Sequence, residues 1–134
     1  MKTWLIIVGG LLMAAAINAD PEDVYLDLMK DQLIHCAKKN GLTEKTPKEI
    51  FYNEMERGEE KASCLVECTM KLRSFIKDSK INLDNVQEFL KIVHADEPDL
   101  LKQKQKAAVD CFDKVKDIDG CKMAFSYVKC FMEN

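Results

Sequence analysis

Beyond position 20, the apolar residues recur at intervals of three and four, the spacing that places them on one face of an α-helix. No stretch shows the strict alternation of a half-buried strand. The first apolar stripe runs from Leu26 to Ala37 and stops before Asn40 and Gly41, a pair that ends helices. Residues 46–49 read Thr-Pro-Lys-Glu, which combines a capping box with proline at the first helical position. A second, short helix is therefore predicted from there to about residue 55.

Four further helices follow from the same spacing. The third is predicted over about residues 59 to 78, with Cys64 and Cys68 one turn apart on it. The fourth covers about residues 84 to 94, Pro98 opens the fifth, and Asp119-Gly120 separates the fifth from the sixth. The pattern predicts an all-α fold: a single compact domain of about six helices joined by short polar turns.

The amino-terminal segment differs from the rest of the chain. Lys2 precedes an apolar run from Trp4 to Ile17, and Ala19 supplies the small residue of a cleavage site. The run is short for a membrane anchor, and acidic residues follow it at once. We interpret residues 1–19 as a signal peptide and residues 20–134 as the helical domain of a soluble secreted protein.

Charge excludes several classes of partner. The formal net charge is −3 at pH 7, and it becomes −4 once Lys2 is removed with the signal peptide. Basic and acidic residues are interspersed, so no basic stripe for nucleic acid and no polybasic patch for a membrane surface is present in the sequence. No nucleophile with a spaced base and no glycine-rich phosphate loop appears, and we expect neither an enzyme nor a cofactor.

Cysteine spacing is the most specific feature. The six cysteines, at 36, 64, 68, 111, 121 and 130, are separated by 27, 3, 42, 9 and 8 residues. An even number in a secreted chain of this size indicates structural disulfides. Six cysteines allow 15 pairings, and sequence alone does not choose among them. A bond between Cys64 and Cys68 is not expected, because side chains one turn apart run side by side along a helix. No metal site is expected, since His35 and His94 have no partner at a ligand spacing.

This pattern of gaps resembles that of the six-cysteine insect odorant-binding proteins, the carriers of pheromones and general odorants. The resemblance implies an apolar ligand cavity between the helices, braced by three disulfides. It also implies the pairs Cys36–Cys68, Cys64–Cys121 and Cys111–Cys130.

The same resemblance implies a ligand-binding set of apolar residues. The corresponding positions are Leu26, Met29, Ile50, Phe51, Val66, Met70, Phe75, Ile76, Leu83, Leu90, Leu101, Ala108, Tyr127 and Phe131. Ordinary core packing is the alternative at each of them. Tyr127 is our preferred hydrogen-bonding residue, with Tyr52 as a second polar group, because a phenol in an apolar pocket needs a partner.

His94 has two interpretations. At the end of the fourth helix it is expected to be a solvated histidine that the nearby helix terminus favours. Alternatively, its protonation shifts the loop before Pro98 and opens an entrance, which makes ligand affinity depend on pH.

The resemblance implies a secreted carrier that binds small hydrophobic, volatile ligands such as odorants or pheromones. It carries them through sensillar lymph or another secreted fluid to receptors in a membrane, as a monomer or weak homodimer that does not itself insert. One alternative is a carrier of hydrophobic ligands with no role in smell. Another is a helical secreted signalling protein with a filled core.

Overall fold

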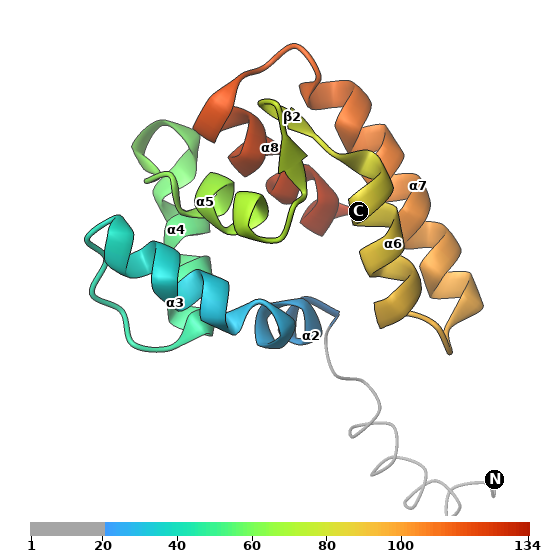
Figure 1. Cartoon of the computed structure of the whole chain (residues 1–134), viewed down its shortest axis with the longest axis horizontal. Helices are drawn as coiled ribbons and strands as arrows, with labels where there is room; N and C mark the ends of the chain where they lie inside the picture. Colours follow the sequence, from blue (N-terminus) through green and yellow to red (C-terminus); the bar gives the residue numbers. More distant parts are fainter. Residues whose placement is uncertain (1–20) are drawn as a thin grey trace, which may run out of the picture.

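The computed structural model describes residues 21–134, and this part of the chain forms seven helices and one short hairpin (Figure 1). The helices are α2 (Pro21–Leu28), α3 (Lys30–Lys39), α4 (Pro47–Lys61), α5 (Leu65–Leu72), α6 (Leu83–Val93), α7 (Pro98–Val115) and α8 (Gly120–Glu133). The strands β1 (Ile76–Lys77) and β2 (Lys80–Ile81) pair antiparallel. The all-α prediction is confirmed. The predicted signal peptide lies outside the described residues, and no helix within them is long and apolar enough to cross a membrane.

Helix ends follow the local sequence signals. The Thr46 hydroxyl accepts from the Glu49 backbone N–H at 3.2 Å, and the Glu49 carboxylate accepts from the Thr46 N–H at 3.2 Å. This is the predicted capping box, and it starts α4 at Pro47. Gly41 follows α3 with a φ of +71°, a left-handed conformation that glycine adopts without steric cost.

The predicted third helix is wrong at both ends. Residues 59–61 belong to α4, which continues past an interruption at Gly58 (φ +80°, ψ 167°). At the other end, Ser74, Asp78 and Ser79 all have positive φ values, which an α-helix does not accommodate. Helix α5 therefore ends at Leu72, and the chain forms the hairpin, in which Ile76 is paired with Ile81. The predicted first helix is also divided, into α2 and α3, at Met29 (φ −106°, ψ 12°).

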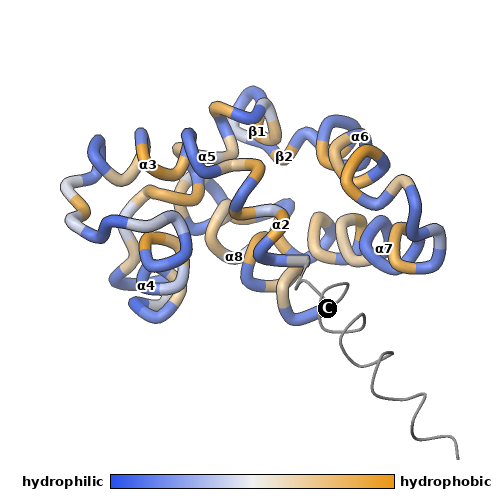
Figure 2. The backbone as a smooth tube through the Cα atoms, turned by 90° about the horizontal axis from the view of Figure 1, so that it is seen from below, coloured by the Kyte–Doolittle hydropathy of each residue, from blue (hydrophilic) through white to orange (hydrophobic). Residues whose placement is uncertain are grey.

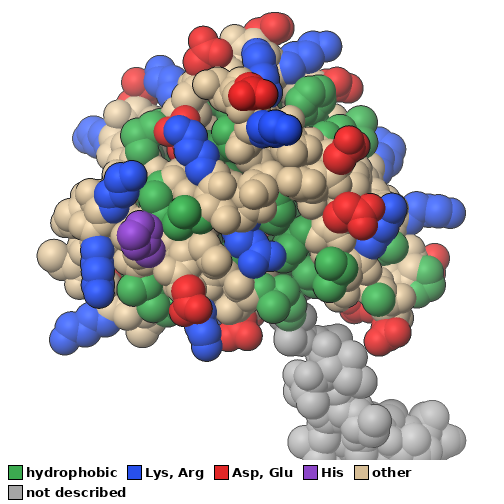
Figure 3. Space-filling view, viewed as in Figure 1, with side chains coloured by type: hydrophobic (Ala, Val, Ile, Leu, Met, Phe, Trp, Pro, Cys, Tyr) green, Lys and Arg blue, Asp and Glu red, His purple; other side chains and the backbone are tan. Residues whose placement is uncertain are grey.

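Helices α5 and α8 form the centre of the molecule. Helix α8 contacts α4, α5 and α7, while α3 packs against α4 and α5, and α6 packs against α7. In both Figure 1 and Figure 2, α3 and α4 lie on one side of this centre and α6 and α7 on the other. Buried apolar residues of the helices form two clusters, one on each side. Figure 3 shows acidic and basic side chains interspersed over one outer face.

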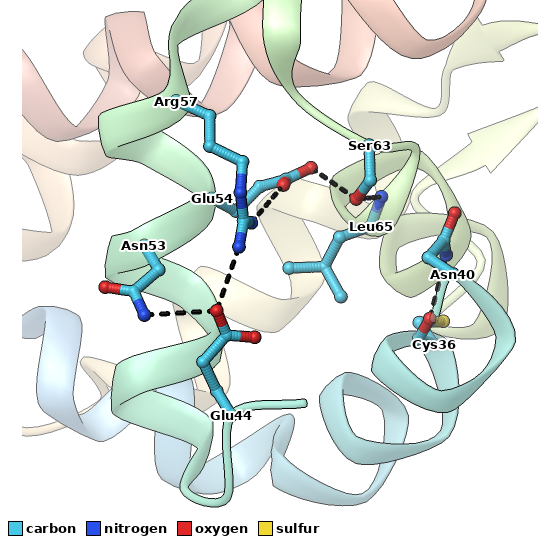
Figure 4. A network of polar contacts seen from close by, with 8 residues as sticks. All are labelled: Cys36, Asn40, Glu44, Asn53, Glu54, Arg57, Ser63 and Leu65. Atoms are coloured by element: carbon cyan, nitrogen blue, oxygen red, sulfur yellow. Dashed lines mark hydrogen bonds and ion pairs between the residues drawn. The ribbon is translucent and has the colours of Figure 1, made fainter. Parts of the chain in front are cut away.

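A buried polar network joins α4 to the start of α5 (Figure 4). Glu54 of α4 is fully buried, and its two carboxylate oxygens accept from Arg57 Nη1 at 2.9 Å and from Ser63 Oγ at 2.8 Å. Arg57 also donates to Glu44 at 2.8 Å, and Ser63 Oγ accepts from the Leu65 N–H at 3.1 Å. Because both oxygens of the buried carboxylate are satisfied, the network holds α4 in place against α5.

Stability is expected to depend on the charge of Glu44. A hydrogen bond from its own backbone, then Asn53 and Arg57, hold the pKa of this carboxyl below its usual value of 4.5. A carboxyl whose pKa is lowered by folding stabilises the protein above its unfolded pKa, and that contribution disappears as pH falls through the folded pKa. Urea unfolding should show Glu44→Gln less stable than wild type at pH 7, with the difference shrinking below about pH 4.5.

The matched control is Glu56→Gln, which changes an exposed carboxyl of α4, the helix that supplies Asn53 and Arg57 to Glu44, and should leave stability almost unchanged at each pH. A deficit of Glu44→Gln that stays constant down to pH 3 contradicts the assignment of the lowered pKa to Glu44.

Candidate functional site

An internal cavity of about 110 Å³ lies where the two buried clusters meet. Helices α2, α3, α5, α6 and α8 contribute to its wall, α4 contributes Phe51, and Phe75 comes from the segment before the hairpin. Its accessible surface consists of apolar atoms. An apolar hollow of this kind, partly open to the surface, is suited to a small hydrophobic molecule.

Most of the residues in the predicted ligand-binding set lie in this wall. The structure brings together Leu26, Met29, Phe51, Val66, Met70, Phe75, Leu90, Tyr127 and Phe131. Eight further residues line the cavity but were not in the predicted set. These are Glu22, Tyr25, Leu33, Thr69, Val86, Phe89, Val128 and Met132. Leu33, Val86 and Phe89 lie on the stripes that predicted the helices, so their burial was indicated, but not which buried residues face a void.

Five residues of the predicted set do not line the cavity. Ile50 and Ala108 are 1% and 0% exposed and fill contacts between helices. Ile76 is in the hairpin, paired with Ile81. Leu83 and Leu101 lie in the first turns of α6 and α7 and remain partly exposed. Their helical spacing predicted burial correctly, but the cavity is lined by only part of the buried face of α6 and by no residue of α7.

Aromatic rings dominate one side of the wall. Tyr25 is in contact with Phe89 and Phe131, with ring centroids 5.9 and 6.0 Å apart, and Phe75 contacts Phe89 at 5.2 Å. Cations cover two of these rings: the Arg73 guanidinium lies 5.2 Å from the Phe89 centroid, and Lys104 Nζ lies 5.4 Å from that of Phe131. Lys104 and Arg73 themselves do not line the cavity, so they act on its wall through the rings.

His94 is buried, which contradicts the expectation of a solvated histidine. Its side chain is 2% exposed, its Nδ1 lies 2.9 Å from Glu97 Oε1, and its Nε2 lies 2.6 Å from the Tyr25 hydroxyl. The bond to Tyr25 connects the end of α6 to α2 across the cavity wall. Burial first, and then the charges of Glu22 and Glu97, raise the pKa of Tyr25, which therefore stays neutral. The hypothesis that His94 makes ligand affinity depend on pH stays a prediction.

The preferred hydrogen-bonding residue already has a protein partner. The Tyr127 hydroxyl donates to the Ala108 carbonyl at 3.0 Å, and burial raises the pKa of this phenol. A carbonyl or ester oxygen on a ligand therefore cannot accept from Tyr127 without breaking a buried hydrogen bond. Tyr52, the second polar group in the prediction, is half-buried beside Phe51 and does not line the cavity.

Three disulfides fix the helices around this space, and they are the pairs that the family resemblance implies. Cys36–Cys68 joins α3 to α5, Cys64–Cys121 joins the residue before α5 to α8, and Cys111–Cys130 joins α7 to α8. Helix α5, which carries Val66 and Met70 of the wall, is thus linked at its N-cap by Cys64 and at its middle by Cys68. Cys64, Cys121 and Glu67 lie close together, but the two sulfur atoms are bonded to each other and offer no thiolate to a metal.

Comparison with protein families supports this arrangement. The model of the PBP/GOBP family matches residues 19–134, which include all six cysteines and every residue of the cavity wall. Searches of curated proteins and of solved structures gave no match. With the family match over nearly the whole chain, the three disulfides and the all-α fold, the chain belongs to the PBP/GOBP family, as a six-cysteine protein of the insect odorant-binding type.

Proposed function

We propose that this chain is a secreted carrier that holds one small hydrophobic, volatile molecule, an odorant or a pheromone, in the cavity. It carries the molecule through an aqueous fluid to membrane receptors. The observation that supports this most directly is the apolar cavity within a disulfide-braced carrier fold.

An unfilled cavity lowers the stability of the protein. An unfilled apolar volume costs about 24 cal/mol per Å³, so about 110 Å³ costs roughly 2.6 kcal/mol. The protein is therefore less stable empty than it would be with a close-packed core. A ligand that fills the space recovers this free energy and adds the burial of its own apolar surface, at about 25 cal/mol per Å².

The cavity also weighs against a secreted signalling protein, because that function needs an outward binding face and a filled core. It does not distinguish a carrier in olfaction from a carrier in another secreted fluid, since both use the same site. The tissue in which the protein is secreted distinguishes these two roles.

Displacement of a fluorescent apolar probe tests the carrier function. Oxidised residues 20–134 contain no tryptophan, so N-phenyl-1-naphthylamine supplies the signal. We expect saturable binding with a Kd in the micromolar range, competition by small volatile compounds, and loss of binding when the disulfides are reduced. A correctly bridged monomer that binds no probe contradicts the carrier function and favours the filled-core alternative.

A further inference from the structure

Two hydroxyl groups of the cavity wall donate their hydrogens to the backbone. Thr69 Oγ1 donates to the Leu65 carbonyl at 2.9 Å, and Tyr127 donates to the Ala108 carbonyl at 3.0 Å. Both residues are at least nine-tenths buried. An oxygen whose hydrogen is used in this way keeps lone pairs and can still accept, but it cannot donate to a ligand.

The third hydroxyl, that of Tyr25, is committed by the tautomer of His94. His94 Nδ1 lies 2.9 Å from a carboxylate oxygen of Glu97, which only accepts, so Nδ1 carries the hydrogen in the neutral imidazole. Nε2 is then the acceptor of the 2.6 Å bond, and the Tyr25 hydroxyl donates to it. Through His94, Glu97 thereby keeps the Tyr25 hydroxyl hydrogen in a protein hydrogen bond. This hydrogen is then not available to a ligand.

The remaining polar groups near the cavity add no donor. Glu22 in the wall has a carboxylate, which accepts only. The ammonium of Lys104 and the guanidinium of Arg73 lie over Phe131 and Phe89, and it is the rings that form the wall. Among the described residues, the cavity therefore presents apolar atoms and, just behind them, acceptors without a free hydrogen.

Cavity size limits the ligand as well. The volume of about 110 Å³ is somewhat smaller than the roughly 150 Å³ of an apolar engineered cavity that holds benzene. The space therefore matches a single ring, and any larger group of the molecule extends toward its open side. The aromatic side chains around the ring offer edge and face contacts.

We propose that the cavity selects compact ring-shaped hydrocarbons and rejects carbonyl compounds of the same skeleton, because its wall, as formed by residues 21–134, has no hydrogen-bond donor to give. This inference rests on the proposed carrier function. A carbonyl oxygen loses its hydrogen bonds to water on entry and gains none, which weakens binding by about ten- to hundredfold. An alcohol is affected less, because it can donate to the lone pairs behind the wall.

The test compares toluene, benzyl alcohol and benzaldehyde as competitors of the fluorescent probe. The reference is the ratio of the water–octanol partition coefficients of toluene and benzaldehyde. Octanol can donate a hydrogen bond to the carbonyl oxygen, so this ratio describes a surrounding that is apolar but still has a donor. We expect the preference for toluene over benzaldehyde to exceed that ratio by about tenfold. A preference equal to the octanol ratio overturns the inference, and so does a bound probe that none of the three displaces. Both results leave the carrier function intact, since only the absence of probe binding contradicts it.

Four variants test whether the wall donates a hydrogen bond to the ligand. Tyr127→Phe and Thr69→Val remove wall hydroxyls and should change benzaldehyde affinity by less than about twofold, since neither hydroxyl donates to the ligand. His94→Leu frees the Tyr25 hydrogen and should strengthen benzaldehyde binding relative to toluene by about tenfold. A large loss of benzaldehyde binding in Tyr127→Phe, in Thr69→Val or in Lys104→Met shows that the wall does donate, and overturns the inference even if His94→Leu does not fold.

Discussion

Val66→Phe is expected to abolish probe binding while leaving the protein at least as stable as wild type. Val66 lies on α5, is 6% exposed and forms part of the cavity wall. A larger side chain there grows into empty space, so it recovers part of the roughly 2.6 kcal/mol that about 110 Å³ of void costs. The same atoms occupy the volume that the ligand needs. We expect the free energy of unfolding to be unchanged or up to about 1 kcal/mol higher, and the probe Kd at least tenfold weaker.

Val115→Phe is the matched control. Val115 is 2% exposed on α7 and does not line the cavity, so the same substitution meets a close-packed core. Overpacking should lower the free energy of unfolding by about 1–3 kcal/mol, while the folded protein still binds the probe. Equal destabilisation of the two variants in urea means that no usable void exists beside Val66. Unchanged probe binding in Val66→Phe places the probe somewhere other than the cavity.

Helix positions were predicted best where the sequence carries local signals. The capping box at Thr46, Pro98 at the start of α7 and Gly120 at the start of α8 each act within one turn, so a reader of sequence can find them. The hairpin was missed because each strand has two residues, too few for an alternation to be visible. Its formation depends on left-handed residues such as Ser74 and Asp78, whose conformation is fixed by the turn and not by hydrophobic spacing.

The site was predicted less completely, because lining a cavity is a property of packing and not of hydropathy. Val86 and Leu83 share a stripe on α6, yet only Val86 reaches the cavity. The surroundings of the polar side chains were harder to predict than those of the apolar ones. Spacing put His94 at a helix end, where solvent was the simplest surrounding, but its burial depends on Tyr25, 69 residues earlier in the chain. The direction of the Tyr127 hydrogen bond likewise depends on where α7 lies against α8.

Removing the bond between Cys64 and Cys121, as Cys64→Ala with Cys121→Ala, is expected to lower the free energy of unfolding by about 4 kcal/mol. The cysteines are 57 residues apart, and closing a loop of that length restricts the unfolded chain by about this amount. Cys64 is exposed and Cys121 half-buried, so little packing is lost with the sulfur atoms. The free energy of unfolding of a domain of this size is roughly 5–15 kcal/mol, so this disulfide accounts for a large share of it.

Lys122→Ala is the control for the double cysteine variant, because it removes an ion pair close to the disulfide and leaves the disulfide intact. Lys122 is next to Cys121 and pairs with Glu60 at 3.1 Å, but both side chains are more than half exposed. An exposed ion pair contributes less than about 1 kcal/mol, so this variant should unfold in urea almost like wild type. A loss below about 1 kcal/mol in the double cysteine variant, with an unchanged urea slope, means that the unfolded chain stays compact without the bond. A loss near 4 kcal/mol shows that the disulfide offsets the cost of the cavity, because it exceeds the roughly 2.6 kcal/mol of the void beside α5.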